Sequence, residues 1–307
     1  MSQTTFPTDL SSYAHRSLPR LSAGERHRFV KARRFLGAGG ILALTREGDM
    51  ALAGPGVCEA LLARSWAARH SHPREMLQLA NVALEVAAEL RTRDLGKAGV
   101  ATLQARAWGE LANALRVAGE AAAAESAFDE AFGRASELGD LYLSAHLLEL
   151  RATMYGATGR PALAVPLLAM VTAVYDESGE RHLAGRARIT HSIYAALRGR
   201  NGDALRLSAE GLARIEPAQD PGLMMTALHN RLLLALRLGA RDEARRTLAL
   251  CHCMARIAGE TSSAVALRLR WMQGRVLQEL GETESAEILL RQAREGLEEL
   301  GLEPLTP

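Results

Sequence analysis

The sequence predicts an all-α protein in which antiparallel helix pairs stack into a solenoid. Three observations support this fold class. Ala, Leu, Arg and Glu fill most positions while aromatic residues make up 4% of the chain, a composition that favours helices over strands. A glycine recurs every 40 residues along much of the chain. Small residues recur at fixed distances from each of these glycines.

Length and charge limit the classes of protein that fit. A chain of 307 residues with 48% hydrophobic residues can bury a large core. Its net charge of +2 argues against a nucleic-acid or membrane-surface protein, because both usually carry a basic surplus or a basic face. No stretch approaches the roughly 18 consecutive apolar residues of a membrane span. Three cysteines without a secretory start segment predict a cytoplasmic protein.

The chain is predicted to begin with a flexible tail and a basic helix. Residues 1–20 are polar and contain two prolines, which is typical of a mobile tail. Ser22 and Glu25 have the spacing of a capping box, so a helix should start there and run to about Leu36. Its basic residues are Arg26, Arg28, Lys31, Arg33 and Arg34.

A glycine cluster at residues 37–40 follows this helix within the segment 21–56. This cluster lacks the preceding strand and following helix of a dinucleotide-binding loop, so we interpret it as a linker. The residues after it predict either a short hairpin, with strands at 41–45 and 50–53, or a loose loop.

Residues 57–303 are predicted to form six helix pairs. A divergent first pair has helices over 58–69 and 75–90, with a turn at 70–73, and would cap the stack. Five regular pairs follow it. Their first helices are predicted near 97–118, 141–158, 181–198, 222–238 and 262–280, and their second helices near 120–138, 161–178, 202–215, 241–258 and 282–300.

Turn glycines mark the regular pairs. They are separated by 40 residues, with a last step of 42: Gly119, Gly159, Gly199, Gly239 and Gly281. The residue five places after each glycine is always alanine: Ala124, Ala164, Ala204, Ala244 and Ala286. We interpret each glycine as the bend of an antiparallel helix pair, and each alanine as the place where the second helix leans against the first.

Two further columns of mostly small residues accompany the glycines. Seven places before the glycine stand Ala112, Ala152, Ser192, Leu232 and Gly274, and twelve places after it stand Ala131, Val171, Gly211, Cys251 and Ala293. Small residues on both helices predict close backbone approach. One pair cannot bury its apolar face alone, so successive pairs must stack.

The best copy resembles the tetratricopeptide repeat at seven positions: Trp108, Ala112, Leu115, Gly119, Ala124, Phe128 and Ala131. The other copies replace the tryptophan, and the period exceeds the roughly 34 residues of the common repeat. The resemblance covers residues 57–300 and is to the extended repeats of bacterial regulators. It implies a right-handed α-α superhelix of about six pairs that binds other proteins.

No motif indicates catalysis, a cofactor or a metal. Cys251, His252 and Cys253 form the most metal-like triplet. On a helix, however, residues two apart point about 200° away from each other, so both thiols cannot reach one ion. The sequence has no nucleophile elbow, phosphate loop or zinc-protease histidine pair, and we expect a protein that is not an enzyme.

The resemblance also implies where a partner would bind. In this repeat family the first helix of each pair lines the concave side. Carried over by position, the binding groove would comprise Arg106, Asn113, Arg116, His146, Glu149, Thr153, Arg186, Ile189, Ile193, His229, Trp271 and Arg275, with Thr226, Leu233 and Arg268 beside them. Arginines outnumber acids in this set, so an acidic protein segment or peptide would suit it.

Three functions are compatible with these features. The first is a scaffold or adaptor that holds a protein or peptide in the groove. The second is a ligand-responsive regulator whose basic N-terminal helix contacts DNA or a transcription regulator, although one helix falls short of a helix-turn-helix. The third is chemistry in the irregular segment, where Thr45, Glu47 and Asp49 are the available groups. The sequence leaves the oligomeric state and the partner open.

Overall fold

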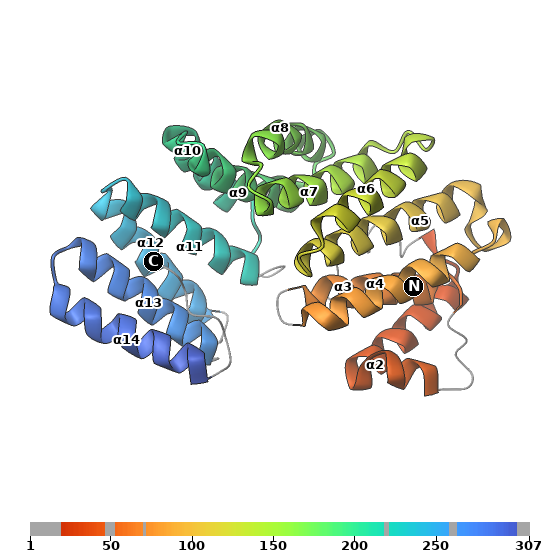
Figure 1. The fold of residues 1–307 in the computed structure, drawn as a ribbon, viewed down its shortest axis with the longest axis horizontal. Helices are drawn as coiled ribbons and strands as arrows, with labels where there is room; N and C mark the ends of the chain where they lie inside the picture. The colour runs from red at the N-terminus through yellow and green to blue at the C-terminus, as the bar shows by residue number, and fades with distance from the viewer. Residues whose placement is uncertain (1–19, 47–52, 70–71, 218–220, 258–262, 300–307) are drawn as a thin grey trace. The chain divides into compact units, whose positions relative to one another are not determined.

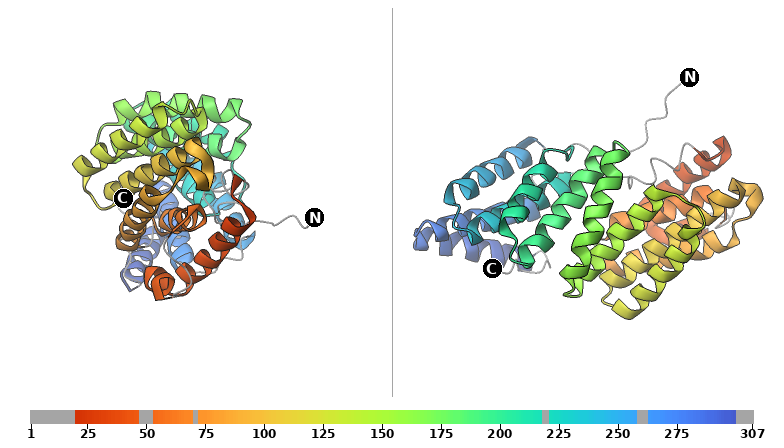
Figure 2. Two further views of the ribbon diagram at one scale, coloured as in Figure 1. Left: turned by 90° about the vertical axis from the view of Figure 1, so that its right-hand side faces the viewer. Right: turned by 90° about the horizontal axis from the view of Figure 1, so that it is seen from above.

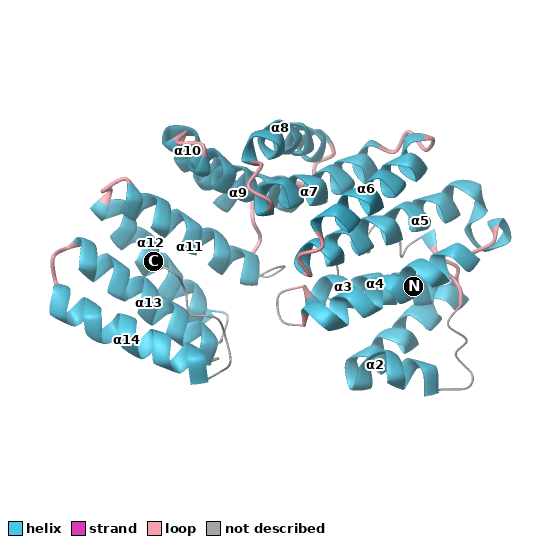
Figure 3. Cartoon of the chain, viewed as in Figure 1, coloured by secondary structure: helices cyan, strands magenta, loops and turns pink. Residues whose placement is uncertain are grey.

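The computed structural model describes residues 20–46, 53–69, 72–217, 221–257 and 263–299. These residues form thirteen helices and no strand (Figure 3), which confirms the predicted all-α class. The chain divides into two compact units, unit 1 (Met1–Gly179) and unit 2 (Glu180–Pro307). Apart from Arg20, the predicted flexible tail lies outside the described residues.

Each unit contains three antiparallel helix pairs, and unit 1 begins with one additional helix (Figure 1). The helices of unit 1 are α2 (Ala23–Arg46), α3 (Pro55–Ala68), α4 (Pro73–Glu89), α5 (Thr92–Val117), α6 (Ala121–Ser136), α7 (Leu141–Ala157) and α8 (Pro161–Glu177). Those of unit 2 are α9 (Arg181–Leu197), α10 (Asn201–Leu212), α11 (Pro221–Arg237), α12 (Arg241–Ile257), α13 (Ser263–Glu279) and α14 (Thr283–Glu299). The predicted helix pairs are confirmed. Helix α5 comprises two helical segments that meet at a kink at Gly96 (φ 72°, ψ 165°), so the predicted start near residue 97 matches the start of its second segment.

The two helices of a pair run side by side, as the further views in Figure 2 also show. Within unit 1 the first helices of successive pairs contact one another, α3 with α5 and α5 with α7. The same holds in unit 2 for α9, α11 and α13. First helices therefore form one continuous layer in each unit, which we call the inner face, and the second helices form the outer layer.

The predicted turn glycines all have a positive φ, between 65° and 84°. This backbone conformation suits glycine because a Cβ atom would be strained there. Gly139 and Gly179, at φ 61° and 72°, end second helices in the same way. These two glycines were not predicted as turns, although they lie midway between the predicted turn glycines.

The small-residue columns are buried where the two helices of a pair meet. The five predicted alanines are all 1% exposed or less. A Cβ atom on Gly211 would lie 2.9 Å from the Gly185 carbonyl oxygen, and one on Gly274 would lie 2.9 Å from Leu290 Cγ. These distances are shorter than ordinary van der Waals contact, so the predicted close approach of the helices is confirmed.

Helix α2 docks on α3 through an apolar face. Phe29, Ala32 and Leu36 are buried in the same core as Val57 and Leu61 of α3. This contact leaves the basic side chains of α2 on its other faces.

Only one half of the predicted capping box forms. Ser22 Oγ accepts a hydrogen bond from the Glu25 N–H at 3.2 Å. The Glu25 carboxylate instead accepts from the Gly56 N–H at 2.8 Å, at the start of α3. A carboxylate is favourable at a helix N-terminus, so Glu25 ties α2 to the first pair.

The expectation of a linker with a hairpin or loose loop after Leu36 is wrong where the structure describes it. Helix α2 continues to Arg46 and is interrupted only at Gly39 and Gly40, whose φ and ψ are not helical. The two glycines form a kink between two helical segments of α2, and Ile41 of the second segment packs against the core of the first pair. Glu47 and Asp49, proposed above as candidate chemical groups, lie outside the described residues.

Candidate functional site on the inner faces

The inner face of unit 1 contains a buried ion pair. Arg106 on α5 donates two hydrogen bonds to the Glu59 carboxylate on α3, one of them at 3.0 Å. Both side chains are 5% exposed or less. The pair compensates two buried charges and joins the first two repeats. Arg106 is therefore committed to Glu59 and not available as an open anion-binding group.

A second polar cluster lies one turn further along α5. The Ser65 hydroxyl lies 2.7 Å from Glu110 Oε1 and 3.2 Å from the Met76 carbonyl oxygen. Burial raises the pKa of Glu110 to about 7, against the opposing effects of Ser65, Arg69, Arg106 and Asn113. The carboxyl group is thus poised to titrate near neutral pH.

The predicted groove residues of this unit mostly bind their neighbours. Asn113 is buried, and its Oδ1 accepts from Arg116 Nη2 at 2.9 Å. Glu149 is buried, and its Oε2 accepts from the Tyr175 hydroxyl at 3.0 Å. Thr153 donates to a backbone carbonyl of its own helix. Of these contacts, the Glu149–Tyr175 bond joins α7 to α8, whereas the other two lie within one helix.

His146 on α7 is half-buried, and its ring faces Trp66 of α3 with centroids 6.4 Å apart. The two rings span the inner face from the first pair to the third. The Arg69 guanidinium lies over the Trp66 ring at 4.4 Å, a cation–π contact that fixes the indole.

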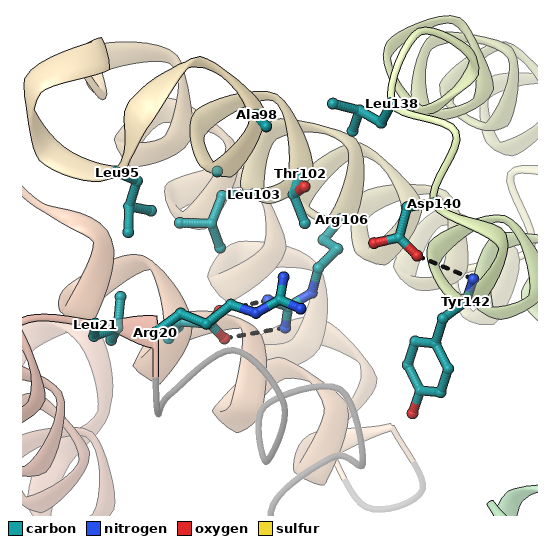
Figure 4. Close-up of a pocket in the computed structure, with 12 residues that line it drawn as sticks. Arg20, Leu21, Leu95, Ala98, Thr102, Leu103, Arg106, Leu138, Asp140 and Tyr142 are labelled. Carbon is teal, nitrogen blue, oxygen red and sulfur yellow. Dashed lines mark hydrogen bonds and ion pairs between the residues drawn. The ribbon is translucent and has the colours of Figure 1, made fainter. Parts of the chain in front are cut away.

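Unit 1 also contains a cavity of about 310 Å³ bordered by the starts of α2, α5 and α7 (Figure 4). Figure 4 shows Arg20 reaching toward Arg106 from one side, with Asp140 and Tyr142 on the other. The Asp140 carboxylate is engaged, since it accepts from the Tyr142 and Leu143 N–H groups at 3.0 Å and caps α7. The apolar walls of the cavity come from Leu21, Leu95, Leu103 and Leu138.

Repeat positions could not have identified this cavity. Arg20 precedes α2, Thr102 lies within α5 and Asp140 caps α7, so these lining residues occupy no common column. Of the predicted groove residues, only Arg106 borders it.

On α9 of unit 2, the predicted groove residues are two isoleucines and one arginine. Ile189 is buried against Gly211, so it is part of the core. Ile193 borders a small cavity of about 110 Å³ together with Leu233 of α11. Arg186 lies on the same helix and is half-buried.

Two aromatic rings stack across α11 and α13. His229 and Trp271 lie 5.2 Å apart between centroids with an interplanar angle of 18°. Burial and the nearby Arg268 lower the pKa of His229, so the imidazole is neutral at physiological pH. A cavity of about 210 Å³ adjoins His229 and is bordered by Met225, Thr226, Arg268 and Met272.

Trp271 also borders a larger cavity of about 450 Å³ between α13 and α14, which we call the basic cavity. Its lining residues are Trp271, Arg275, Glu287, Leu290, Arg291, Arg294 and Leu297. The Arg275 guanidinium lies 5.8 Å from the Trp271 ring centroid.

The arginines of the basic cavity are unpaired within the part of the chain that the structure describes. Arg275 Nε is buried there without a hydrogen-bond partner. None of Arg275, Arg291 and Arg294 forms an ion pair with a described carboxylate, whereas Arg231 and Arg246 of the same unit do. Sequence reasoning missed Arg291 and Arg294 because the family pattern points only to first helices.

The metal-like triplet on α12 behaves as its helical spacing predicts. Cys251 is buried in the small-residue column, and Cys253 is exposed. Burial raises the pKa of the Cys251 thiol to about 12. Across the described ranges, no group of three or more His, Cys, Asp or Glu side chains could hold a metal ion.

No protein-family model matches the sequence, and no curated protein matches it. Solved structures do resemble the chain. A putative kinesin light chain from P. anserina with nearly identical TPR-like repeats is 18% identical, with a TM-score of 0.53 over 65% of this chain and 97% of that one. The fold is that of TPR-like repeats. BtubC from P. vanneervenii has the same repeats at 17% identity and a TM-score of 0.61, over 77% of this chain and 95% of the other.

Another solved structure matches more of the length of this TPR-like chain. The Rap protein complexed with Competence and Sporulation Factor is 15% identical, with a TM-score of 0.59 over 94% of this chain and 74% of that one. At these identities the likeness concerns the fold alone.

None of the helices in the described ranges is long and apolar enough to cross a membrane.

Proposed function

We propose that this protein is a non-enzymatic scaffold or adaptor that binds an acidic segment of another protein or a peptide in the basic cavity between α13 and α14 of unit 2. The basic cavity would hold the acidic side chains, and the His229–Trp271 stack beside it would contact the chain between them. The observation that carries this proposal is the set of three arginines without carboxylate partners around one cavity.

The chemistry of arginine supports this choice of ligand. A guanidinium offers five donors in a planar fork that matches a carboxylate, and a buried donor without a partner costs free energy. Arg275 Nε is such a donor. A carboxylate placed between Arg275 and Arg294 would therefore gain charge-assisted hydrogen bonds and relieve that cost. Arg and Trp are also the residues that most often anchor interfaces.

The comparisons are consistent with a binding role. One structure of the same fold is described as complexed with Competence and Sporulation Factor. Three cysteines free of disulfides fit a cytoplasmic protein. Fold alone does not define a partner, so the proposal depends on the basic cavity.

Labelled peptides test the proposal directly. We expect short peptides of Glu and Leu to bind the full chain in fluorescence anisotropy, and matched peptides of Gln and Leu to bind at least about tenfold more weakly, because loss of a charge-assisted contact costs more than about 1.4 kcal/mol. Arg294→Glu should abolish the preference for acidic peptides. Arg256→Glu, which makes the same charge change at an exposed site on α12, is the control. Equal affinity for the two peptides would refute the assignment of the basic cavity as the binding site. An equal loss of affinity for the acidic peptide in the two variants would refute it as well.

A second candidate is a ligand-responsive regulator that acts through α2. Arg20 and Leu21 border the cavity of unit 1 and directly precede this basic helix, so a ligand in the cavity would contact the start of α2. In this scheme α2 contacts DNA or a transcription regulator. It predicts that the full chain retards duplex DNA in a native gel, and that added salt weakens this shift. Reversing the charge of the exposed Arg34 should weaken the shift as well. Absence of any shift at low salt argues against DNA as the partner.

A further inference from the structure

The cavity of unit 1 has charges of both signs in its lining (Figure 4). Its polar lining residues are two arginines, two carboxylates, a threonine and a tyrosine: Arg20, Arg106, Glu59, Asp140, Thr102 and Tyr142. The charges of the two arginines and the two carboxylates cancel. A ligand with a net charge would meet groups of its own sign here, which is unfavourable. The lining therefore favours a ligand that is neutral overall.

Only some of these charges are paired inside the protein. Arg106 and Glu59 bind each other. Arg20 is exposed and forms no ion pair with any carboxylate in the described part of the chain. Asp140 uses a single oxygen, Oδ1, for the two N–H groups that it caps, and no group among the described residues donates to its Oδ2. One guanidinium and one carboxylate oxygen are thus open to a ligand.

These two open groups face the same cavity without binding each other. Figure 4 shows Arg20 reaching in from one side and Asp140 lying on the other. The Thr102 hydroxyl borders the same space and forms no hydrogen bond with another described residue. A molecule that carries both a carboxylate and an ammonium group can place the first on Arg20 and the second on Asp140, with charge-assisted hydrogen bonds at both ends.

The remaining wall of the cavity selects for an apolar body. Four leucines form it: Leu21, Leu95, Leu103 and Leu138. Leu21 and Leu103 are each 3% exposed, so an apolar group placed against them would leave water, which is favourable. The volume of about 310 Å³ is at the lower end of the roughly 300–1,000 Å³ of small-molecule sites. The cavity therefore suits a small ligand rather than a folded segment.

We propose that this cavity binds an apolar amino acid, free or in a short peptide, as a zwitterion. The carboxylate binds Arg20, the ammonium group binds Asp140, and the apolar side chain lies among the leucines. A free amino acid and a dipeptide share this chemistry and differ in the separation of their charges, so both enter the test. The inference rests on the second candidate function only in taking this cavity as a ligand site, and it does not depend on what α2 contacts.

Other classes of ligand fit the lining less well. A phosphate or a nucleotide would place several negative charges beside Glu59 and Asp140. A fatty acid would bring its carboxylate to Arg20 but leave Asp140 without a donor. A polyamine would meet the guanidinium groups of Arg20 and Arg106. In each case a charge is repelled or left unpaired in a partly desolvated site, which costs free energy.

Isothermal titration calorimetry of the full chain tests the proposal with leucine and with the dipeptide Leu-Leu. We expect at least one of them to bind with a stoichiometry of one. The N-acetyl form of the same ligand lacks the ammonium charge, and its C-terminal amide lacks the carboxylate. Each blocked form should bind at least about tenfold more weakly, because it loses one charge-assisted contact.

Two variants assign the ends of the ligand. Asp140→Asn keeps the cap of α7, since Asn caps a helix as well as Asp does, but it removes the charge. It should weaken the zwitterion at least about tenfold and leave the N-acetyl form no weaker. Arg20→Gln should weaken the zwitterion equally and leave the C-terminal amide no weaker.

Three control variants place the binding in this cavity. Glu120→Gln and Arg74→Gln change exposed residues of unit 1, and Arg294→Glu alters the basic cavity of unit 2. All three should bind the zwitterion like the wild type. The proposal is overturned if neither zwitterion binds at millimolar concentration, if the blocked forms bind equally well, or if Asp140→Asn and Arg20→Gln leave the affinity unchanged. Retardation of DNA and binding of acidic peptides are measured separately, so these outcomes leave both proposed functions standing.

Discussion

Glu110 shows how one buried side chain can make the stability of a repeat depend on pH. The Ser65 hydroxyl has a single hydrogen but lies within reach of two acceptors, Glu110 Oε1 and the Met76 carbonyl oxygen. If Glu110 is protonated, it donates to Ser65, which then donates to Met76. If Glu110 is ionised, one acceptor loses its hydrogen bond. Geometry therefore agrees with the raised pKa of Glu110.

This arrangement predicts a loss of stability on ionisation of Glu110. Its pKa rises from 4.5 to about 7 on folding, so its stabilising contribution is complete below the unfolded pKa and is lost as the pH rises through the folded pKa. Relative to Glu110→Gln, the wild type should lose stability between about pH 5 and about pH 8, by at most roughly 3 kcal/mol.

Urea unfolding at both pH values measures this difference. Glu120→Gln, which changes an exposed glutamate of the same unit, is the control and should follow the wild type. A constant difference between the wild type and Glu110→Gln at the two pH values would contradict the assigned titration.

Residue-scale prediction from the sequence was limited by partners far away in the chain. The family pattern placed Arg106 and Glu149 on the inner face, but it could not show that Glu59 and Tyr175 would bind them. Inner-face side chains can serve either a partner or the stack itself. The choice depends on contacts between repeats, which only the structure provides.

At the scale of elements, the helix pairs were predictable because their turns and contacts repeat. A glycine with positive φ and an alanine five places later recur in every regular pair. Helix α2 was harder to predict, since residues 37–40 have the composition of a linker yet are bridged by helix on both sides. Gly39 and Gly40 do leave the helical conformation, in keeping with the low helix propensity of glycine, but the helix resumes after them and Ile41 packs against the first pair.

Two glycines on one helix test the close packing of pairs. A Cβ on Gly211 would meet the Gly185 carbonyl and Ile189, whereas a Cβ on Gly202 would meet nothing within 4 Å. We expect Gly211→Ala to destabilise the protein by roughly 1–3 kcal/mol. Gly202→Ala should stabilise it by about 0.4–1 kcal/mol, since alanine lowers the entropy of the unfolded chain.

Chemical denaturation of the two variants gives both values. Equal effects of the two substitutions would show that helices α9 and α10 are not packed as tightly as described.

At the scale of the molecule, a solenoid distributes its interactions between neighbouring repeats, so each pair can carry its own surface chemistry. The inner face of unit 1 contains the buried ion pair of Arg106 and Glu59. Unit 2 carries the unpaired arginines of the basic cavity. The repeat pattern defines the scaffold of both units but not this difference, because surface charges are not constrained by the packing that repeats.

Hydrogen–deuterium exchange of the full chain, with and without a saturating Glu–Leu peptide, tests the proposed binding site most directly. The account predicts slower exchange in α13 and α14, around the basic cavity, and unchanged exchange in α3 and α5. Protection confined to unit 1, or no protection at saturation, would contradict it.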